Sequence, residues 1–228
     1  MSETVYLSPS TQENNTGVGK YGTEEKRMNQ VCDVVEKILK QHGITTYRNK
    51  PAMTLGEVVR DSNSKNPNIH FAIHSNAYNK TSRGCEVFCW KKDCEGEKLA
   101  KIIYDIVSAI TPTSDRGVKY AYNFYGPGKH MYEVANTTAD TVLIEIAFHD
   151  NEYDAAWIIA NIEKIGIAIA KGILKYLGIV YKSETKKDYK TILKEVSNYS
   201  DIWVSFVKAH PEVNLSGLIE VLYYHKGV

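Results

Sequence analysis

Residues 69–77 read as a strand buried on both faces that ends at a turn-forming Ser-Asn pair, and this strand carries His70 and His74. Residues four apart on a strand share a face but lie ~13 Å apart, whereas a zinc-bound nitrogen lies ~2.1 Å from the ion. At most one of the two histidines is therefore a ligand. His74 lies at the C-terminal end, where parallel strands present side chains to a ligand crevice. A hydrogen-bonded structural role is the alternative.

Glu145 is the second residue whose position suggests chemistry. It lies in the middle of an apolar run, residues 141–148, and burying a carboxylate is costly unless another group pairs with it. Apolar neighbours on both sides disfavour an edge strand that turns Glu145 toward water. His149 follows four residues later, which is too far along a continuing strand to share a site with Glu145.

The elements that position these residues follow from hydrophobic periodicity. Strands are expected at residues 5–7, 44–48, 69–77, 84–90 and 141–148. Helices are expected from Thr23 to His42, at 54–63 and 97–111, from near Asp154, and at 162–177. Strands that alternate with helices predict an α/β fold, with a mostly parallel twisted sheet and helices on both faces.

Composition excludes some classes of partner. The 28 basic and 27 acidic residues give a net charge of +1, so broad electrostatic binding to nucleic acid is not expected. No window of about 18 apolar residues predicts a membrane span, and no Sec-type signal opens the sequence. We therefore expect a protein made in the cytoplasm, where its four cysteines stay free thiols.

The C-terminal part differs in composition from residues 1–179. Residues 180–188 are charged and predict a linker, and residues 189–228 predict a small helical module of two amphipathic helices. About forty residues seldom fold alone. We therefore expect this module to pack on the first domain or to form a homodimer through its helices.

Five segments carry a resemblance to a known family. They are Val5-Tyr-Leu-Ser-Pro9, Glu25 four residues before Asn29, Ile73-His-Ser-Asn-Ala77, Asp115-Arg-Gly-Val118, and Leu143-Ile-Glu-Ile146 followed by Asp150-Asn151. In this order they resemble the zinc-dependent N-acetylmuramoyl-L-alanine amidases, especially those of clostridial phage endolysins. The resemblance covers residues 1–179, the expected catalytic domain. It also implies that the helical module of residues 189–228 binds the cell wall.

The resemblance implies a Zn²⁺ ion held by a histidine after the first strand, a glutamate at the start of the first helix, and His74. Alignment on Asn29 selects Glu25 as the glutamate, whereas helical periodicity favours Glu24; we follow the alignment. The chain has no histidine before His42. Gln12 is the nearest oxygen donor in that loop, and the alternatives for the third ligand are Glu13 and the distant His130. A neutral amide binds zinc weakly.

The resemblance also implies the reaction. The bond cleaved joins N-acetylmuramic acid to L-alanine of the peptidoglycan stem peptide, by zinc-activated water with Glu145 as acid–base catalyst. Asn76 would bind substrate, with a turn residue as the equal alternative. Lysis at the end of phage infection, or autolysis or sporulation in the mother cell, would bring an enzyme without an export signal to the wall. The rival readings are a wall-binding protein with impaired catalysis and a different zinc peptidase of the wall.

Overall fold

This computed structural model describes residues 3–113 and 116–183. The six strands of the described part are β1 (Thr4–Pro9), β2 (Thr45–Arg48), β3 (Ile69–Asn76), β4 (Glu86–Cys89), β5 (Val118–Tyr120) and β6 (Asp140–Phe148). Its six helices are α1 (Glu24–Gln41), α2 (Leu55–Lys65), α3 (Glu95–Ser108), α4 (Tyr132–Asn136), α5 (Glu152–Ala160) and α6 (Ile162–Tyr176). The predicted linker and helical module, apart from residues 180–183, lie outside the described residues.

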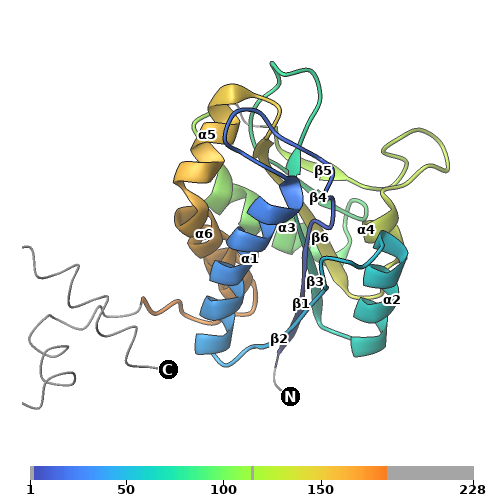
Figure 1. Cartoon of the computed structure of the whole chain (residues 1–228). Coiled ribbons are helices and arrows are strands. Elements are labelled where there is room, and N and C mark those ends of the chain that lie inside the picture. Colours follow the sequence, from blue (N-terminus) through green and yellow to red (C-terminus); the bar gives the residue numbers. More distant parts are fainter. Residues whose placement is uncertain (1–2, 114–115, 184–228) are drawn as a thin grey trace, which may run out of the picture. The chain divides into compact units, whose positions relative to one another are not determined.

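One sheet in the order β2-β1-β3-β6-β4-β5 forms the centre of the described part (Figure 1). Strands β2, β1, β3 and β6 are mutually parallel, whereas β4 runs antiparallel to β6. The predicted α/β class and mostly parallel sheet are confirmed. The orientation of β4 follows from its connection to β3, since a parallel crossover needs a dozen or more residues and only residues 77–85 join the two strands.

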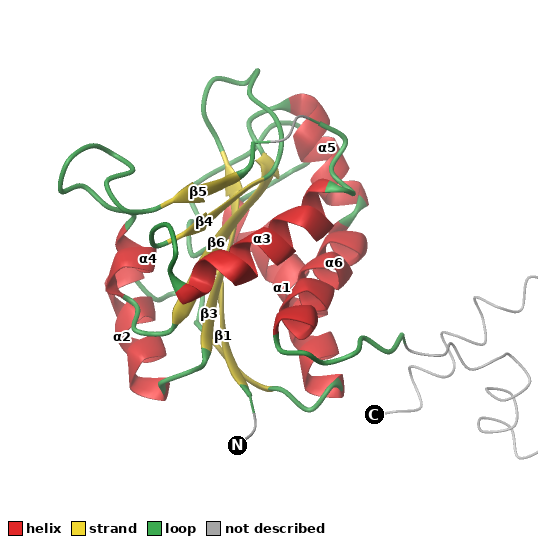
Figure 2. Ribbon diagram, turned by 180° about the vertical axis from the view of Figure 1, so that it is seen from behind, coloured by secondary structure: helices red, strands yellow, loops and turns green. Residues whose placement is uncertain are grey.

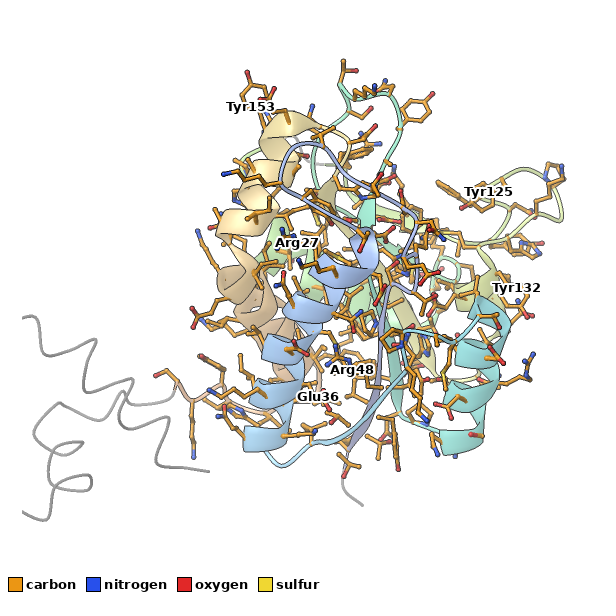
Figure 3. The ribbon with its side chains drawn as sticks, viewed as in Figure 1. Arg27, Glu36, Arg48, Tyr125, Tyr132 and Tyr153 are labelled. Atoms are coloured by element: carbon orange, nitrogen blue, oxygen red, sulfur yellow. The ribbon has the colours of Figure 1, made fainter. Side chains whose placement is uncertain are left out.

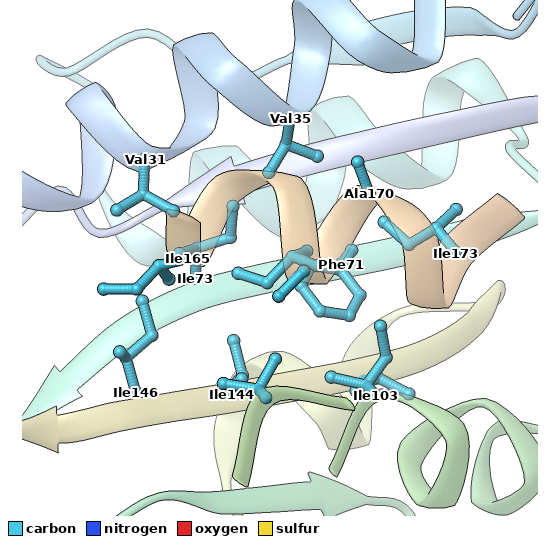
Figure 4. Packing of buried hydrophobic residues seen from close by; sticks show 14 of the residues in the cluster. Val31, Val35, Phe71, Ile73, Ile103, Ile144, Ile146, Ile165, Ala170 and Ile173 are labelled. Carbon is cyan, nitrogen blue, oxygen red and sulfur yellow. The ribbon is translucent and has the colours of Figure 1, made fainter. Parts of the chain in front are cut away.

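Helices cover both faces of the sheet, as predicted (Figure 2). Helices α1, α3 and α6 lie on one face, and α2 and α4 lie on the other. The larger core lies under α1, α3 and α6, where Val31, Phe71, Ile144 and Ile165 pack together (Figure 4). A second, smaller core contains Ala72 and Leu143 from the same strands. Strands β3 and β6 are therefore buried on both faces, which explains their continuous apolar sequence.

The short helix α4 and the strand β5 were not predicted. The sequence between residues 118 and 136 is rich in tyrosine and glycine and shows no periodicity that would mark either element. Residues 121–131, between β5 and α4, form the aromatic loop. Its exposed aromatic side chains include Tyr122, Phe124 and Tyr125, and Figure 3 shows Tyr125 on this loop.

Gly166 lets α6 approach α1 closely. A Cβ atom at this position would lie 2.5 Å from Cβ of Val34 and 3.0 Å from the carbonyl oxygen of Val31. We expect Gly166→Ala to lower the free energy of unfolding by about 1–3 kcal/mol, because overpacking forces neighbours apart. Urea unfolding followed by circular dichroism measures this change. The exposed Lys164→Ala on the same helix should change it by less than about 0.5 kcal/mol, and equal loss in both variants would contradict the packing argument.

Candidate active site

A row of ionisable side chains crosses three adjacent strands near the carboxyl ends of β3 and β6. His74 of β3 is in register with Glu145 of β6, and Glu145 is opposite Glu86 of β4. Register partners present their side chains on the same face of a sheet. The histidine and the glutamate singled out from the sequence are therefore neighbours, although 71 positions separate them in the chain.

Helix α1 brings a second carboxylate to His74. Thr23 caps this helix by accepting a hydrogen bond from the backbone N–H of Lys26, which places Glu24 in the first turn. Glu24 is buried, and its Oε1 lies 2.8 Å from Nδ1 of His74. The backbone N–H of Ser75 donates to the same oxygen at 3.3 Å. The helix N-terminus further favours a negative charge at this position.

The glutamate that contacts His74 is Glu24, and not Glu25, which the alignment selected. Glu25 is half-buried, and its carbonyl oxygen accepts a hydrogen bond from the side chain of Asn29. Because successive helical residues differ by about 100°, Glu24 shares the buried face with Met28 while Glu25 lies on its flank. Helical periodicity therefore indicated the glutamate that contacts His74.

The contact between His74 and Glu24 shifts both pKa values. Burial alone would raise the pKa of Glu24, but the hydrogen bond and positive charge of His74 outweigh it and lower that pKa. Burial would lower the pKa of His74, but the neighbouring carboxylates of Glu133 and Glu24 raise it well above its usual value. Without a metal ion, the two side chains form an ion pair.

Glu145 is the carboxylate of the row that lacks a full set of partners. Its Oε2 atom is buried and has no hydrogen-bond partner among the described residues. Burial raises the pKa of Glu145 to about 8, the charge of His74 opposes this shift, and Glu24 and Glu86 add to it. A carboxyl group with a raised pKa can both accept and return a proton near neutral pH, as an acid–base catalyst must.

The loop after β1 reaches the site through Asn15. The Nδ2 atom of Asn15 donates to Oε2 of Glu24 at 2.6 Å. Gln12 and Glu13 are exposed, and Gln12 accepts a hydrogen bond from Asn15 at 3.3 Å. Gln12 is thus a neighbour of Asn15, and it is Asn15 that touches the buried carboxylate.

The other two candidates from the sequence, Asn76 and His130, form hydrogen bonds to neighbouring groups of the protein. The side-chain amide of Asn76 donates to Oε1 of Glu86, and its oxygen accepts from the backbone N–H of Ala77. His130, in the aromatic loop, accepts a hydrogen bond from the backbone N–H of Asn123 and stacks on Tyr122. The role of Asn76 toward substrate stays a prediction.

Sequence reasoning missed Glu133 and the place of His149. His149 follows the end of β6 and is buried; its Nδ1 lies 2.8 Å from Oγ of Ser75 and its Nε2 lies 3.0 Å from Oδ1 of Asn15. It therefore supports Asn15, and through it Glu24. No local pattern marks Glu133, because its partners Ser8 and His70 lie 125 and 63 positions away in the chain, and the contact of Asn15 with His149 spans 134 positions.

Zinc requires nitrogen, sulfur or oxygen donors that converge on one position. Nδ1 of His74 and the carboxylate of Glu24 are zinc donors that already meet at one point. Within residues 3–113 and 116–183, no group of three or more His, Cys, Asp or Glu side chains is placed to hold a metal ion. His74 and Glu24 can supply two ligands for zinc, and the remaining ligands would be neutral oxygen atoms.

The sequence profile of the N-acetylmuramoyl-L-alanine amidase family matches residues 5–175, which include all of these groups. The chain belongs to the N-acetylmuramoyl-L-alanine amidase family. The amidase hydrolyses the amide bond between N-acetylmuramic acid and L-alanine of the peptidoglycan stem peptide, and its family is generally zinc-dependent. No curated protein matches its sequence at a significant level. No helix in the described part is both long and apolar enough to cross a membrane.

Solved structures share the fold of the amidase. Cwp6 from Clostridium difficile is 25% identical with a TM-score of 0.69, over 78% of this chain and 30% of that protein. The N-acetylmuramoyl-L-alanine amidase AmiC2 of Nostoc punctiforme is 21% identical with a TM-score of 0.67, over 77% and 97% of the two chains. The catalytic domain of the CD27L endolysin, which targets Clostridia difficile, is 19% identical with a TM-score of 0.62, over 77% and 98%.

Proposed function

We propose that His74 and Glu24 hold the zinc ion of this amidase and that Glu145 is its acid–base catalyst. The observation that carries this proposal is the 2.8 Å contact between Nδ1 of His74 and Oε1 of Glu24, with Glu145 at the adjacent register position. A bound zinc ion would polarise the scissile carbonyl group and acidify a water molecule. The buried Oε2 atom of Glu145, which lacks a partner among the described residues, is the group free to take a proton.

Glu145 then carries both proton transfers of amide hydrolysis. Glu145 accepts a proton from the attacking water, whose oxygen bonds to the carbonyl carbon of the lactyl group. The same carboxyl group returns the proton to the alanine nitrogen as the carbon–nitrogen bond breaks. The products are a free lactyl carboxylate and a stem peptide with a free amino terminus. Glu24 and Glu86 favour the protonated form of Glu145, which strengthens it as the base of the first transfer.

The loop after β1 distinguishes this zinc site from one whose third ligand is a second imidazole. Asn15 is the loop residue that contacts Glu24, and neutral amide or water oxygens are weaker zinc ligands than imidazole or thiolate. We therefore expect a chelator such as EDTA to remove the metal readily and to abolish hydrolysis. Elemental analysis and activity before and after dialysis, followed by re-addition of Zn²⁺, measure this. Full activity in the metal-free protein would contradict the zinc assignment.

We further propose a lytic role at the bacterial cell wall, as an endolysin or an autolysin. The structural similarity to the catalytic domain of a clostridial endolysin supports this setting. Made in the cytoplasm, the enzyme would reach peptidoglycan after release through a membrane lesion. The exposed aromatic side chains of the aromatic loop are suited to stacking on sugar rings. Wall binding and homodimerisation by residues 189–228 are proposals that lie outside the described residues.

Product analysis on purified cell walls tests the reaction. The amidase should release new amino groups that belong to alanine and should create no new reducing sugar ends. A wall peptidase would instead expose amino groups of other residues in the stem. Wall binding without release of any product would favour the impaired-catalysis alternative and would contradict the proposed function.

A further inference from the structure

A second buried carboxylate faces the other side of His74. Glu133 belongs to α4, on the face of the sheet opposite α1, and it is 4% exposed. Its Oε2 atom lies 3.7 Å from Nε2 of His74, within ion-pair distance. His74 therefore lies between two carboxylates, with Glu24 at Nδ1 and Glu133 at Nε2.

We propose that Glu133 is a positioning residue that orients His74 for zinc, through the ring nitrogen that does not face the ion. This inference rests on the proposed zinc site. Metal-binding histidines generally donate their second ring N–H to a carboxylate or carbonyl group, which fixes the tautomer and the ring orientation. Because an ionised carboxylate only accepts hydrogen bonds, Glu133 favours the hydrogen on Nε2. The lone pair of Nδ1 then faces Glu24 and the ion.

The surroundings of Glu133 hold its carboxylate in place. Its Oε1 accepts hydrogen bonds from Oγ of Ser8 at 2.5 Å and from Nε2 of His70 at 2.9 Å. His70 is in turn held by Oγ of Ser62 at 2.8 Å and by stacking on the ring of Tyr6. Oε1 is therefore occupied by its hydrogen bonds to Ser8 and His70, whereas Oε2 lies toward His74.

This arrangement explains why one strand carries two histidines on the same face. His70 and His74 are too far apart to share a metal ion, but one carboxylate spans the gap between them. His70 hydrogen-bonds to Oε1 of Glu133 near the start of β3, and this holds Oε2 of Glu133 next to His74 near the end of the strand. Helix α4 and its connection to β6 therefore contribute to the zinc site without supplying a ligand.

The variant Glu133→Gln tests the inference. Glutamine keeps the size of the side chain and can still accept from Ser8 or His70 with its oxygen, but its NH₂ group then faces Nε2 of His74. This favours the tautomer with hydrogen on Nδ1, where the ion should bind. We expect the dissociation constant for Zn²⁺, measured by competition with a chromophoric chelator, to weaken about 10- to 100-fold.

Ser62→Ala is the matched control. It perturbs the same buried network at its far end but leaves the carboxylate of Glu133 facing His74. Both variants should lower the melting temperature, whereas only Glu133→Gln should weaken zinc binding. Equal zinc affinity of the wild type and Glu133→Gln, or equal weakening in both variants, would overturn the positioning role.

A measurement on the wild type makes the test independent of how the variants fold. Nitrogen-15 NMR of the zinc-loaded protein should show the single ring hydrogen of His74 on Nε2. A hydrogen on Nδ1 would overturn the inference. A wild-type protein that binds no zinc at all would instead refute the proposed function, so the two failures are distinguishable.

Discussion

Replacing Glu145 by alanine should slow peptidoglycan hydrolysis by about 10²- to 10⁴-fold, the usual contribution of a positioned acid–base group. The zinc content should stay near that of the wild type, because His74 and Glu24 remain. The physical reason is that Glu145 has a buried oxygen atom without a hydrogen-bond partner in the described residues and lies beside His74 in register. Release of alanine amino groups from purified walls measures the rate, and elemental analysis measures the metal.

Stability separates loss of catalysis from loss of structure in this variant. Leaving a buried polar atom unsatisfied costs about 1–3 kcal/mol, so removing the carboxylate of Glu145 should leave the melting temperature unchanged or raise it. The exposed Glu152→Ala on α5 serves as the control and should retain full activity. Glu145→Ala with most of its activity intact would remove Glu145 from the mechanism.

The pair Glu24→Ala and Glu25→Ala should give opposite results. Loss of Glu24 removes a proposed ligand, so zinc affinity should fall by more than the roughly 10- to 100-fold that follows loss of an outer partner, and hydrolysis should fall with it. Loss of Glu25 should change affinity by less than about threefold, because substitutions away from such features change free energies by about 0.5 kcal/mol. Isothermal titration with Zn²⁺ measures both variants.

These two variants also show whether the alignment on Asn29 or the helical periodicity identifies the glutamate that binds zinc. Zinc binding that survives Glu24→Ala and disappears in Glu25→Ala would support the alignment on Asn29 and contradict the contact seen at His74. The opposite result would show that the buried face of α1, which contains Glu24 and Met28, identifies the ligand. The substitutions are adjacent and chemically identical, so general effects on charge or on helix stability cancel in the comparison.

Much of the fold could be predicted because it depends on local patterns. Continuous apolar runs identified β3 and β6 as strands buried on both faces, and periodicity identified α1, α3 and α6. The place of β4 in the sheet could not be predicted in this way, because it depends on which strand it pairs with. Strand β4 follows β3 in the chain but pairs with β6, a choice made by packing of the whole sheet.

For the site, His74 and Glu145 could be selected as candidates from the sequence, since an ionisable residue within an apolar strand is costly and therefore conspicuous. Their partners could be found only in the folded chain. Glu24 and Glu133 reach His74 from α1 and α4, and Asn15 reaches His149 from the loop after β1. These contacts span 50 to 134 positions and leave no local pattern. The physical reason is that burial is encoded along each strand and helix, whereas hydrogen-bond partners are chosen only when separate elements pack together.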